Sequence, residues 1–233
     1  MSKIIISILV LSTIMFGAMD DDKAKIRQGL DKFQSVPLDK AVILQEGEAK
    51  MYCPICGMTL PMFYKTNHAA THDGHTEQYC SLHCLVDTNL KNDNSLKDMK
   101  VVDTITLKFI DAKDANYVVG SSIKGTMSMV SKYAFYDIKD AEAFKLEFGG
   151  EIMNFEQAYK VAADALAGEL KKMAKKRIAK AKKGEMIYNK MCKKTDKKFN
   201  SVAEAKAYIM SSNICGNINS KKLQAVGIYL GKR

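Results

Sequence analysis

Four cysteines in the first half of the chain have the spacing of a metal-binding cluster. Two residues separate Cys53 from Cys56, three separate Cys80 from Cys84, and 23 residues lie between the two pairs. Thiolates from two close pairs on separate elements can converge on one ion, and they are soft donors that select Cu(I), Zn(II) or iron–sulfur centres. The spacing therefore predicts a metal site without identifying the metal.

Three other uses of these thiols fit the same spacing. All four could hold a structural zinc ion, or they could form two disulfides in an oxidising compartment. The third use is a redox dithiol in Cys53-Pro54-Ile55-Cys56, whose chemistry relies on a helix that starts at the first cysteine. The following residues, Gly57 and Thr59-Leu60-Pro61, make a poor helix start, and they argue against this third use.

Two methionines favour copper over zinc. Met58 lies two residues after Cys56, and Met127 lies in the turn-like sequence Gly125-Thr126-Met127 of the second half. Thioether sulfur is a good ligand for Cu(I) and a poor one for Zn(II), so both methionines are candidate ligands. Packing in the hydrophobic core is the more ordinary role of a methionine, and we assign it to Met99, Met153 and Met173.

Histidines extend the candidate site. His83 lies between Cys80 and Cys84 in the sequence, and we include it among the candidate ligands. Three further histidines, His68, His72 and His75, lie within eight residues of one another just before the second cysteine pair. Imidazole is a common metal ligand, so these three are candidates for the place where an incoming ion first binds.

The elements that must position these residues follow from hydrophobic periodicity and turn signals. The first half is predicted to contain a helix over 20–35, a strand, turn and strand over 41–66, a loop over 67–75, a strand over 77–80 and a helix over 82–90. The second half is predicted to contain strands over 101–110, 116–120, 133–136 and 152–155 and a helix over 138–148. The similar order of the halves predicts an α+β fold of two strand-strand-helix units.

A helical region follows the two units. Apolar residues at helical spacing predict one long helix over 156–190, with a break at Gly184, and then a small helical C-terminal module. The predicted divisions of the chain are therefore an N-terminal signal or anchor (1–19), an N-terminal helical segment (20–47), a metal-binding domain (48–160), a basic helical linker (161–183) and the C-terminal module (184–233).

The first 19 residues have the pattern of a secretory signal. Lys3 precedes an apolar run from Ile4 to Phe16, which is short for a membrane span of about 20 residues. Bulky Phe16 stands where cleavage after Ala18 prefers a small residue, so an uncleaved membrane anchor is the alternative. The sequence predicts export to the periplasm in either case.

Several motifs resemble the NosL family of copper-binding accessory proteins for nitrous oxide reductase maturation. The first half carries Cys53-Pro-Ile-Cys56-Gly57-Met58 and Gln78-Tyr79-Cys80-Ser81-x-x-Cys84-Leu85. The second half carries Phe109-Ile110-Asp111-Ala112, Tyr117-Val118-x-Gly120-Ser121, Gly125-x-Met127, Ala141-x-Ala143-Phe144 and Phe148-Gly149-Gly150. The motifs stand in order over residues 48–160.

This resemblance implies a Cu(I) chaperone, not an enzyme, that delivers copper to a periplasmic reductase in denitrification. It implies that Cys56, Met58 and Met127 are ligands, with Cys53, Cys80 and Cys84 beside them. Members of the family are commonly lipoproteins, but the first cysteine of this sequence is Cys53, so a lipid-modified N-terminal cysteine is not expected. The long C-terminal region is a second departure from the family pattern.

The C-terminal module resembles a c-type cytochrome domain without haem. Residues 184–192 resemble its opening and residues 223–230 its last helix. Covalent haem attachment needs Cys-x-x-Cys-His, whereas this sequence has Cys192-Lys-Lys-Thr195-Asp196, so no haem is expected. Cys192 and Cys215 are expected to form a disulfide, which would stabilise an exported module by about 3 kcal/mol.

The positive charge of the chain is local. The net charge is +10, but residues 171–198 alone hold 13 Lys or Arg and two acids, so that stretch carries +11 and the remainder about −1. A basic helix can contact an anionic membrane surface or an acidic partner, or it can simply be solvated. Because the charge is confined to one segment, nucleic acid is not an expected partner.

Overall fold

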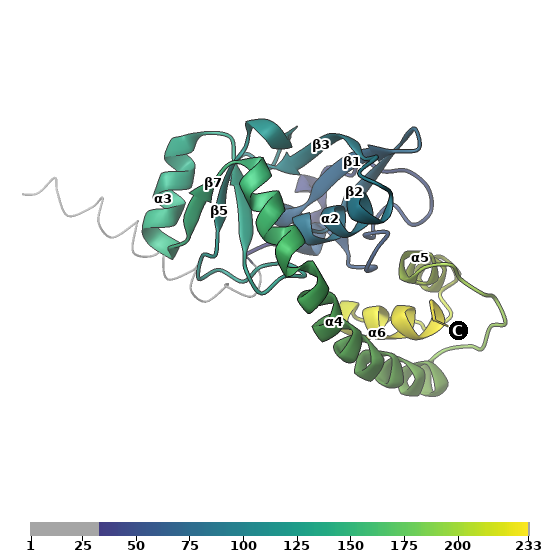
Figure 1. Cartoon of the computed structure of the whole chain (residues 1–233). Coiled ribbons are helices and arrows are strands. Elements are labelled where there is room, and N and C mark those ends of the chain that lie inside the picture. The colour runs from purple at the N-terminus through teal and green to yellow at the C-terminus, as the bar shows by residue number, and fades with distance from the viewer. Residues whose placement is uncertain (1–32, 233) are drawn as a thin grey trace, which may run out of the picture. The chain divides into compact units, whose positions relative to one another are not determined.

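The computed structural model describes residues 33–232 and has an α+β fold, as the sequence predicts (Figure 1). Its strands are β1 (His68–His72), β2 (His75–Tyr79), β3 (Lys97–Val102), β4 (Phe109–Asp111), β5 (Asn116–Val119), β6 (Lys132–Phe135) and β7 (Glu151–Met153). Its α-helices are α2 (Leu82–Lys91), α3 (Ile138–Phe148), α4 (Phe155–Met191), α5 (Val202–Ser212) and α6 (Ser220–Leu230). Short 3-10 helices are η2 (Leu38–Lys40), η3 (Leu60–Thr66) and η4 (Ala112–Asp114).

The two halves of the metal-binding region share one topology. In the first sheet β1 lies between β2 and β3, and in the second sheet β5 lies between β6 and β7. All of these pairs are antiparallel, and the helix of each half, α2 or α3, connects the second strand to the third. Each unit is therefore strand-strand-helix-strand, one strand longer than predicted, and β4 extends the first sheet beside β3.

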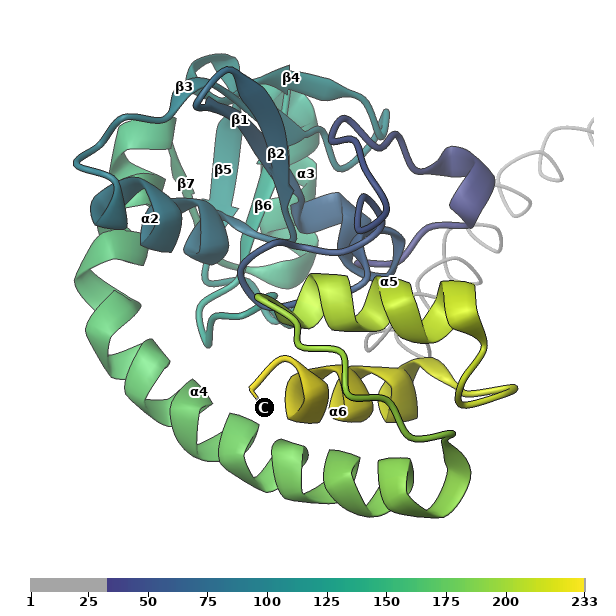
Figure 2. The same cartoon turned by 90° about the vertical axis from the view of Figure 1, so that its right-hand side faces the viewer.

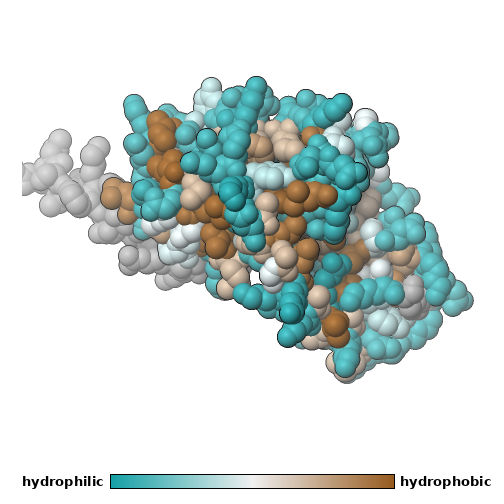
Figure 3. All heavy atoms as spheres, in the orientation of Figure 1, coloured by the Kyte–Doolittle hydropathy of each residue, from teal (hydrophilic) through white to brown (hydrophobic). Residues whose placement is uncertain are grey.

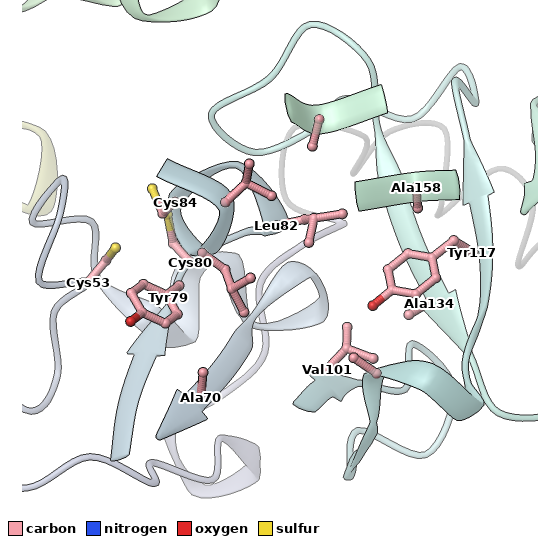
Figure 4. Packing of buried hydrophobic residues seen from close by; sticks show 14 of the residues in the cluster. Cys53, Ala70, Tyr79, Cys80, Leu82, Cys84, Val101, Tyr117, Ala134 and Ala158 are labelled. Carbon is pink, nitrogen blue, oxygen red and sulfur yellow. The ribbon is translucent and has the colours of Figure 1, made fainter. Parts of the chain in front are cut away.

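Buried side chains join the two sheets. His68 of β1 stacks on Tyr117 of β5 and its Nε2 lies 3.2 Å from the tyrosine hydroxyl. The Thr66 hydroxyl donates to the Thr126 hydroxyl at 2.8 Å. Figure 4 shows the continuous core between them, with Tyr79 and Cys80 on the side of the first sheet and Tyr117 and Ala134 on the side of the second.

The strand, turn and strand predicted for residues 41–66 are not formed. A single bridge joins Tyr52 and Thr59, and residues 60–66 form the 3-10 helix η3. Pro54 and Pro61 remove backbone donors that strand pairing would need. The intervening amides are used in a tight turn, as described below for the cysteines.

The loop predicted for residues 67–75 is instead β1 with the turn that leads into β2. The His and Thr residues of β1 are polar, so the sequence does not show the alternation of apolar and polar residues that predicts a strand. The first three residues are nevertheless buried, and β1 lies between β2 and β3 in the sheet. The strand predicted over 101–110 is interrupted as well. Asp103 accepts hydrogen bonds from the amide and hydroxyl of Thr106, and this turn separates β3 from β4.

The long helix α4 is continuous through Gly184, so the predicted break there is wrong. The C-terminal module predicted over 184–233 would begin inside this helix, and that division stays a prediction. Asn154 and Gln157 form a capping box that fixes the start of the helix. A Cβ at Gly184 would lie 2.0 Å from the carbonyl oxygen of Ala225 in α6, so this glycine permits a close helix–helix approach rather than a break. The predicted linker 161–183 is thus the middle of a 37-residue helix.

The C-terminal helices have a small core of their own. Figure 2 shows α6 between α5 and the second half of α4, and Tyr188, Ile209 and Val226 are among the buried residues at their junction. A disulfide joins Cys192 and Cys215, with an S–S distance of 2.06 Å, which is the pairing that the sequence analysis expects.

The N-terminal predictions are described only in part. The predicted signal or anchor (1–19) and residues 20–32 of the helical segment lie outside the described residues. Residues 34–47 contain only the short 3-10 helix η2 after Pro37, and nearly all of the helix predicted over 20–35 lies outside the described residues. Among residues 33–232, no helix is long and apolar enough to cross a membrane.

Candidate metal centre

The first cysteine pair lies on a tight turn. The Cys53 amide donates to the Met58 carbonyl at 2.9 Å, and the Gly57 amide donates to the Cys53 carbonyl at 2.8 Å. Gly57 adopts a φ of +71°, a conformation that glycine adopts readily and other residues rarely do. We call residues 53–58 the cysteine turn. It bends the chain so that two thiols and one thioether leave a short stretch of backbone.

The second pair lies where β2 passes into α2. Cys80 directly follows the last residue of β2, Ser81 is the N-cap of α2, and Cys84 lies in the first turn of the helix. Figure 4 shows the side chains of Cys53, Cys80 and Cys84 close together at this end of the hairpin. The junction between β2 and α2 therefore places the thiols of Cys80 and Cys84 close to those of the cysteine turn.

The four thiols form one buried group. Their sulfur atoms all lie within 4.8 Å of one another, and the group is the only cluster of three or more Cys, His, Asp or Glu ligands among residues 33–232. Sγ of Cys56 lies 3.4 Å from Sγ of Cys80, which in turn lies 3.7 Å from Sγ of Cys84. These separations are longer than a disulfide bond and fit thiols that surround one soft ion.

Burial and hydrogen bonds among the thiols shift the pKa values of three of them in different directions. Burial alone would raise the pKa of Cys53, but hydrogen bonds from Cys56, Cys80 and Cys84 lower it well below the usual thiol value. Burial raises the pKa of Cys80, and hydrogen bonding to Cys53 and Cys56 raises it further. Hydrogen bonds to the other three thiols, together with burial, also raise the pKa of Cys84. The pKa of Cys53 is thus shifted in the direction opposite to that of Cys80 and Cys84.

The two candidate methionines line a pocket of about 240 Å³. Met58, Met127 and Cys56 all line it, so one thiol of the buried group and both thioethers share this space. Met127 has a φ of +57°, which is uncommon for a residue with a side chain. We call this space the thioether pocket.

His83 does not join the thiols, although it neighbours Cys84 in the sequence. Its Nδ1 donates to Glu169 Oε2 of α4 at 2.8 Å, and both side chains are buried. The other oxygen of Glu169 accepts from the Ser128 hydroxyl at 2.7 Å and from the Met129 amide at 2.9 Å. His83 is therefore part of a buried contact that holds the loop between β5 and β6, which carries Met127 and which we call the Met127 loop. This contact does not favour the predicted role of His83 as a metal ligand.

The other three histidines do not converge either. His68 is buried against Tyr117, and its Nδ1 lies 3.0 Å from the Thr66 carbonyl. His72 lies 3.6 Å from Glu77, whereas His75 lines a different pocket of about 660 Å³. His72 pairs with His75 beside the turn of the hairpin, whereas His68 lies at the other end of β1, four residues or about 13 Å away, so the three histidines do not make one site.

The C-terminal helices contact the cysteine turn directly, which the sequence analysis did not anticipate. The ammonium group of Lys206 in α5 donates to the Gly57 carbonyl at 2.6 Å, to the Thr59 hydroxyl at 3.1 Å and to Gln224 Oε1 at 2.8 Å. The side-chain amide of Gln224 in α6 donates through Nε2 to the Cys56 carbonyl at 3.0 Å. No local pattern marks Lys206 or Gln224, because their partners in the cysteine turn lie 149 and 168 residues away in the chain.

Lys206 places a buried cation beside the thiols. Its side chain is 1% exposed, and its ammonium lies 4.2 Å from the centre of the Tyr52 ring. Burial lowers the pKa of Lys206 to about 7, whereas ionised Cys56, Cys53 and Cys80 would raise it. Ionised thiols would therefore favour the protonated form of Lys206, whose positive charge would offset theirs.

Comparison with known proteins supports the resemblance. The NosL family model matches residues 45–163. The copper-binding lipoprotein NosL of Stutzerimonas stutzeri is 30% identical over 115 residues, a match that covers 45% of this chain and 60% of the relative's length. The crystal structure of the copper chaperone NosL from Shewanella denitrificans is 24% identical, with a TM-score of 0.39, and the match covers 53% of this chain and 94% of that one. The family model ends inside α4, so most of α4 and all of α5 and α6 lie beyond it.

Proposed function

The chain belongs to the NosL family, and we propose that it is a Cu(I) chaperone that stores copper or delivers it to a periplasmic reductase such as nitrous oxide reductase. The proposed role is binding and transfer of an ion, without catalysis. The observation that carries it is the group of four buried thiols within 4.8 Å of one another, beside a pocket lined by thioethers. Soft sulfur donors of both kinds suit Cu(I).

We assign the four thiols and two thioethers distinct parts in this proposal. Cys53, Cys80 and Cys84 lie in the buried group, where they would hold the ion away from water and from oxidants. Cys56 belongs both to the group and to the pocket wall, so it is the thiol through which an ion would arrive or leave. Met58 and Met127 would hold the ion on the pocket side.

Structural zinc is the second candidate, because four thiolates around one point also match a closed zinc site. Zinc gives no role to Met58 or Met127, since thioethers bind it poorly. The burial of all four thiols argues against a thiol-disulfide enzyme, whose attacking thiolate must be accessible.

The test is a titration of the reduced protein with Cu(I) against a competing chelator, with Zn(II) in parallel. We expect tight Cu(I) binding that weakens at least tenfold, about 1.4 kcal/mol, in Met58→Ala and in Met127→Ala. Met186→Ala is the matched control, because Met186 is 65% exposed on α4 and does not line the pocket. Tight Zn(II) binding that is unaffected by both pocket variants would instead establish a structural zinc module.

Export and membrane contact complete the proposal. The predicted signal over 1–19 and the basic stretch 171–198 support a location at the cell envelope, and the relative from Stutzerimonas stutzeri is named a lipoprotein. Fractionation of cells that express the full chain would test this: we expect the protein in the periplasmic or membrane fraction. The anionic membrane surface stays a prediction, which binding to vesicles with and without anionic lipid would test.

A further inference from the structure

The thioether pocket has a wall that lies outside the region matched by the family model. Met173, Lys176 and Lys180 of α4 and Gln224 of α6 line it together with Cys56, Met58 and Met127. We propose that this pocket is a relay site for Cu(I), separate from the four-thiol group, and that Met173 supplies its third thioether ligand. The inference rests on the proposed copper function and adds a ligand from the C-terminal region to it.

Glu169 holds the residues that follow Met127 against α4, the helix that carries Met173. Glu169 is buried, and its carboxylate binds Ser128 and Met129, the two residues after Met127, as well as His83 of α2. Met173 follows Glu169 by four residues in the same helix, so both side chains lie on one face of α4. The contact that holds the Met127 loop therefore also orients Met173 towards the pocket.

The opposite side of the pocket is fixed by the other two C-terminal helices. Gln224 donates to the Cys56 carbonyl, and Lys206 donates to the Gly57 carbonyl and to Gln224. Val202 of α5 occupies the space above Gly57, where a Cβ would lie only 2.3 Å from it. The cysteine turn, which carries Met58, is therefore held by α5 and α6. Met127 and Met173 lie on the side of the pocket that is held by Glu169 of α4.

The chemistry of this lining selects a soft monovalent ion. Met58, Met127 and Met173 are neutral donors, partly buried, and three thioethers suit Cu(I) and disfavour Zn(II). Three cations, Lys176, Arg177 and Lys180, also line the pocket. Their repulsion grows with the charge of the ion, so it is about twice as large for a divalent ion as for Cu(I) at the same place.

Transfer from this site to the thiols needs no change of oxidation state. A thioether–copper bond breaks as the Cys56 sulfur binds the ion, and the Cys56 thiol releases its proton to water in the pocket. Cys80 Sγ lies 3.4 Å from Cys56 Sγ, so the next exchange requires little movement. The same steps in reverse would return Cu(I) to the pocket, where a partner could bind it.

The test compares Met173→Leu with Met186→Leu, a matched change at an exposed position of the same helix. The first readout is the NMR signal of the methionine methyl groups, labelled with carbon-13, during an anaerobic Cu(I) titration of the full chain. We expect the Met173 methyl signal to shift together with those of Met58 and Met127, while that of Met186 stays in place. The second readout is the rate at which an excess of chelator withdraws Cu(I), which should change at least threefold in Met173→Leu only.

The outcomes separate this inference from the proposed function. A Met173 methyl signal that stays unchanged while Cu(I) binds would overturn the relay site and leave copper binding by the thiols intact. A wild-type protein that binds no Cu(I) would overturn the proposed function itself. The methyl readout uses wild-type protein, so it decides the question even if Met173→Leu does not fold.

Discussion

At the scale of single residues, Gly57 serves both the cysteine turn and the packing of α5 against that turn. Its φ of +71° closes the cysteine turn, and its lack of a side chain leaves room for Val202 of α5. The first requirement is local, but the second arises from a residue far along the chain. The structure therefore makes Gly57 less replaceable than a glycine that serves a turn alone.

Gly57→Ala should destabilise the protein more than Gly47→Ala does. Gly47 also has a positive φ, +87°, but nothing lies within 4 Å of a Cβ there, so its replacement costs only the backbone strain of about 1–2 kcal/mol. At Gly57 the clash with Val202 adds about 1–3 kcal/mol of overpacking. Urea unfolding of the two variants measures the difference. Equal losses at both positions would show that Val202 does not lie against the turn.

At the scale of elements, the two sheets depend on a buried histidine. Burial lowers the pKa of His68 to about 4, far below its value of 6.5 in an unfolded chain. The neutral ring is held between the Thr66 carbonyl and the Tyr117 hydroxyl, so β1 and β5 share it. Between pH 6.5 and 4 the unfolded chain binds a proton at this position and the folded chain does not, so stability is present above that window and is lost as the pH falls through it.

Acid should therefore weaken the wild type more than His68→Gln. Between pH 7.5 and pH 5 this histidine alone should reduce the free energy of unfolding by about 2 kcal/mol. The variant lacks the titrating ring, so its loss over the same interval should be smaller by that amount. Urea unfolding of both proteins at the two pH values gives the comparison. Parallel losses would mean that His68 titrates normally and is not buried as described.

Contacts between α5, α6 and the cysteine turn are a second feature of this scale. Lys206 satisfies a buried carbonyl of Gly57 and the side chain of Gln224 at the same time. A lysine that contacted the turn only loosely would be exposed, whereas this one is 1% exposed. We infer that this contact stabilises the packing of α5 and α6 against the cysteine turn. A protonated Lys206 would also offset the negative charge of the thiolates.

Lys206→Met should lower both stability and copper affinity. The apolar side chain keeps the length but leaves buried acceptors without a donor, at a cost of about 1–3 kcal/mol for each. Loss of the positive charge should also weaken Cu(I) binding by the thiolates several-fold. Lys221→Met, at an exposed position of α6, is the control. The assays are urea unfolding and chelator competition; a variant that matched the control in both would refute the role given to Lys206.

At the scale of the whole molecule, positive charge is concentrated beside the pocket. Lys176, Arg177 and Lys180 belong to the stretch that carries +11, and they line the pocket. Figure 3 shows hydrophilic residues along the edges of this face and hydrophobic residues across its middle. The charge therefore lies where copper would be exchanged, which suits steering of anionic copper carriers or acidic partners.

Removal of the three pocket charges should slow copper exchange with anionic acceptors. We expect combined replacement of Lys176, Arg177 and Lys180 by Ala to reduce the rate of Cu(I) withdrawal by an anionic chelator about tenfold at low salt. The effect should shrink at high salt and with a neutral chelator. Replacement of the exposed Lys171, Lys172 and Lys175 removes the same charge from the same helix without touching the pocket. Equal slowing by both sets would show that net charge, not the pocket wall, governs exchange.

The sequence by itself determined the features that depend on neighbouring residues. Cysteine spacing identified the four thiols, soft-ligand chemistry singled out Met58 and Met127, and periodicity predicted α3 with its bounds. The family was also recognisable, because its motifs lie in order along residues 48–160. Each of these signals is carried by short motifs, and the residues inside each motif lie within a few positions of one another.

Only the tertiary structure decided what surrounds the thiols. His83 is turned to Glu169 across 86 residues, and Lys206 reaches Gly57 across 149. The sequence assigns Met173 to core packing, because it belongs to an apolar stripe at helical spacing that is typical of a buried helix face. Its place in the pocket depends on how α4 lies against the Met127 loop. Such contacts follow from the folded path of the whole chain, so no local pattern of residues could specify them.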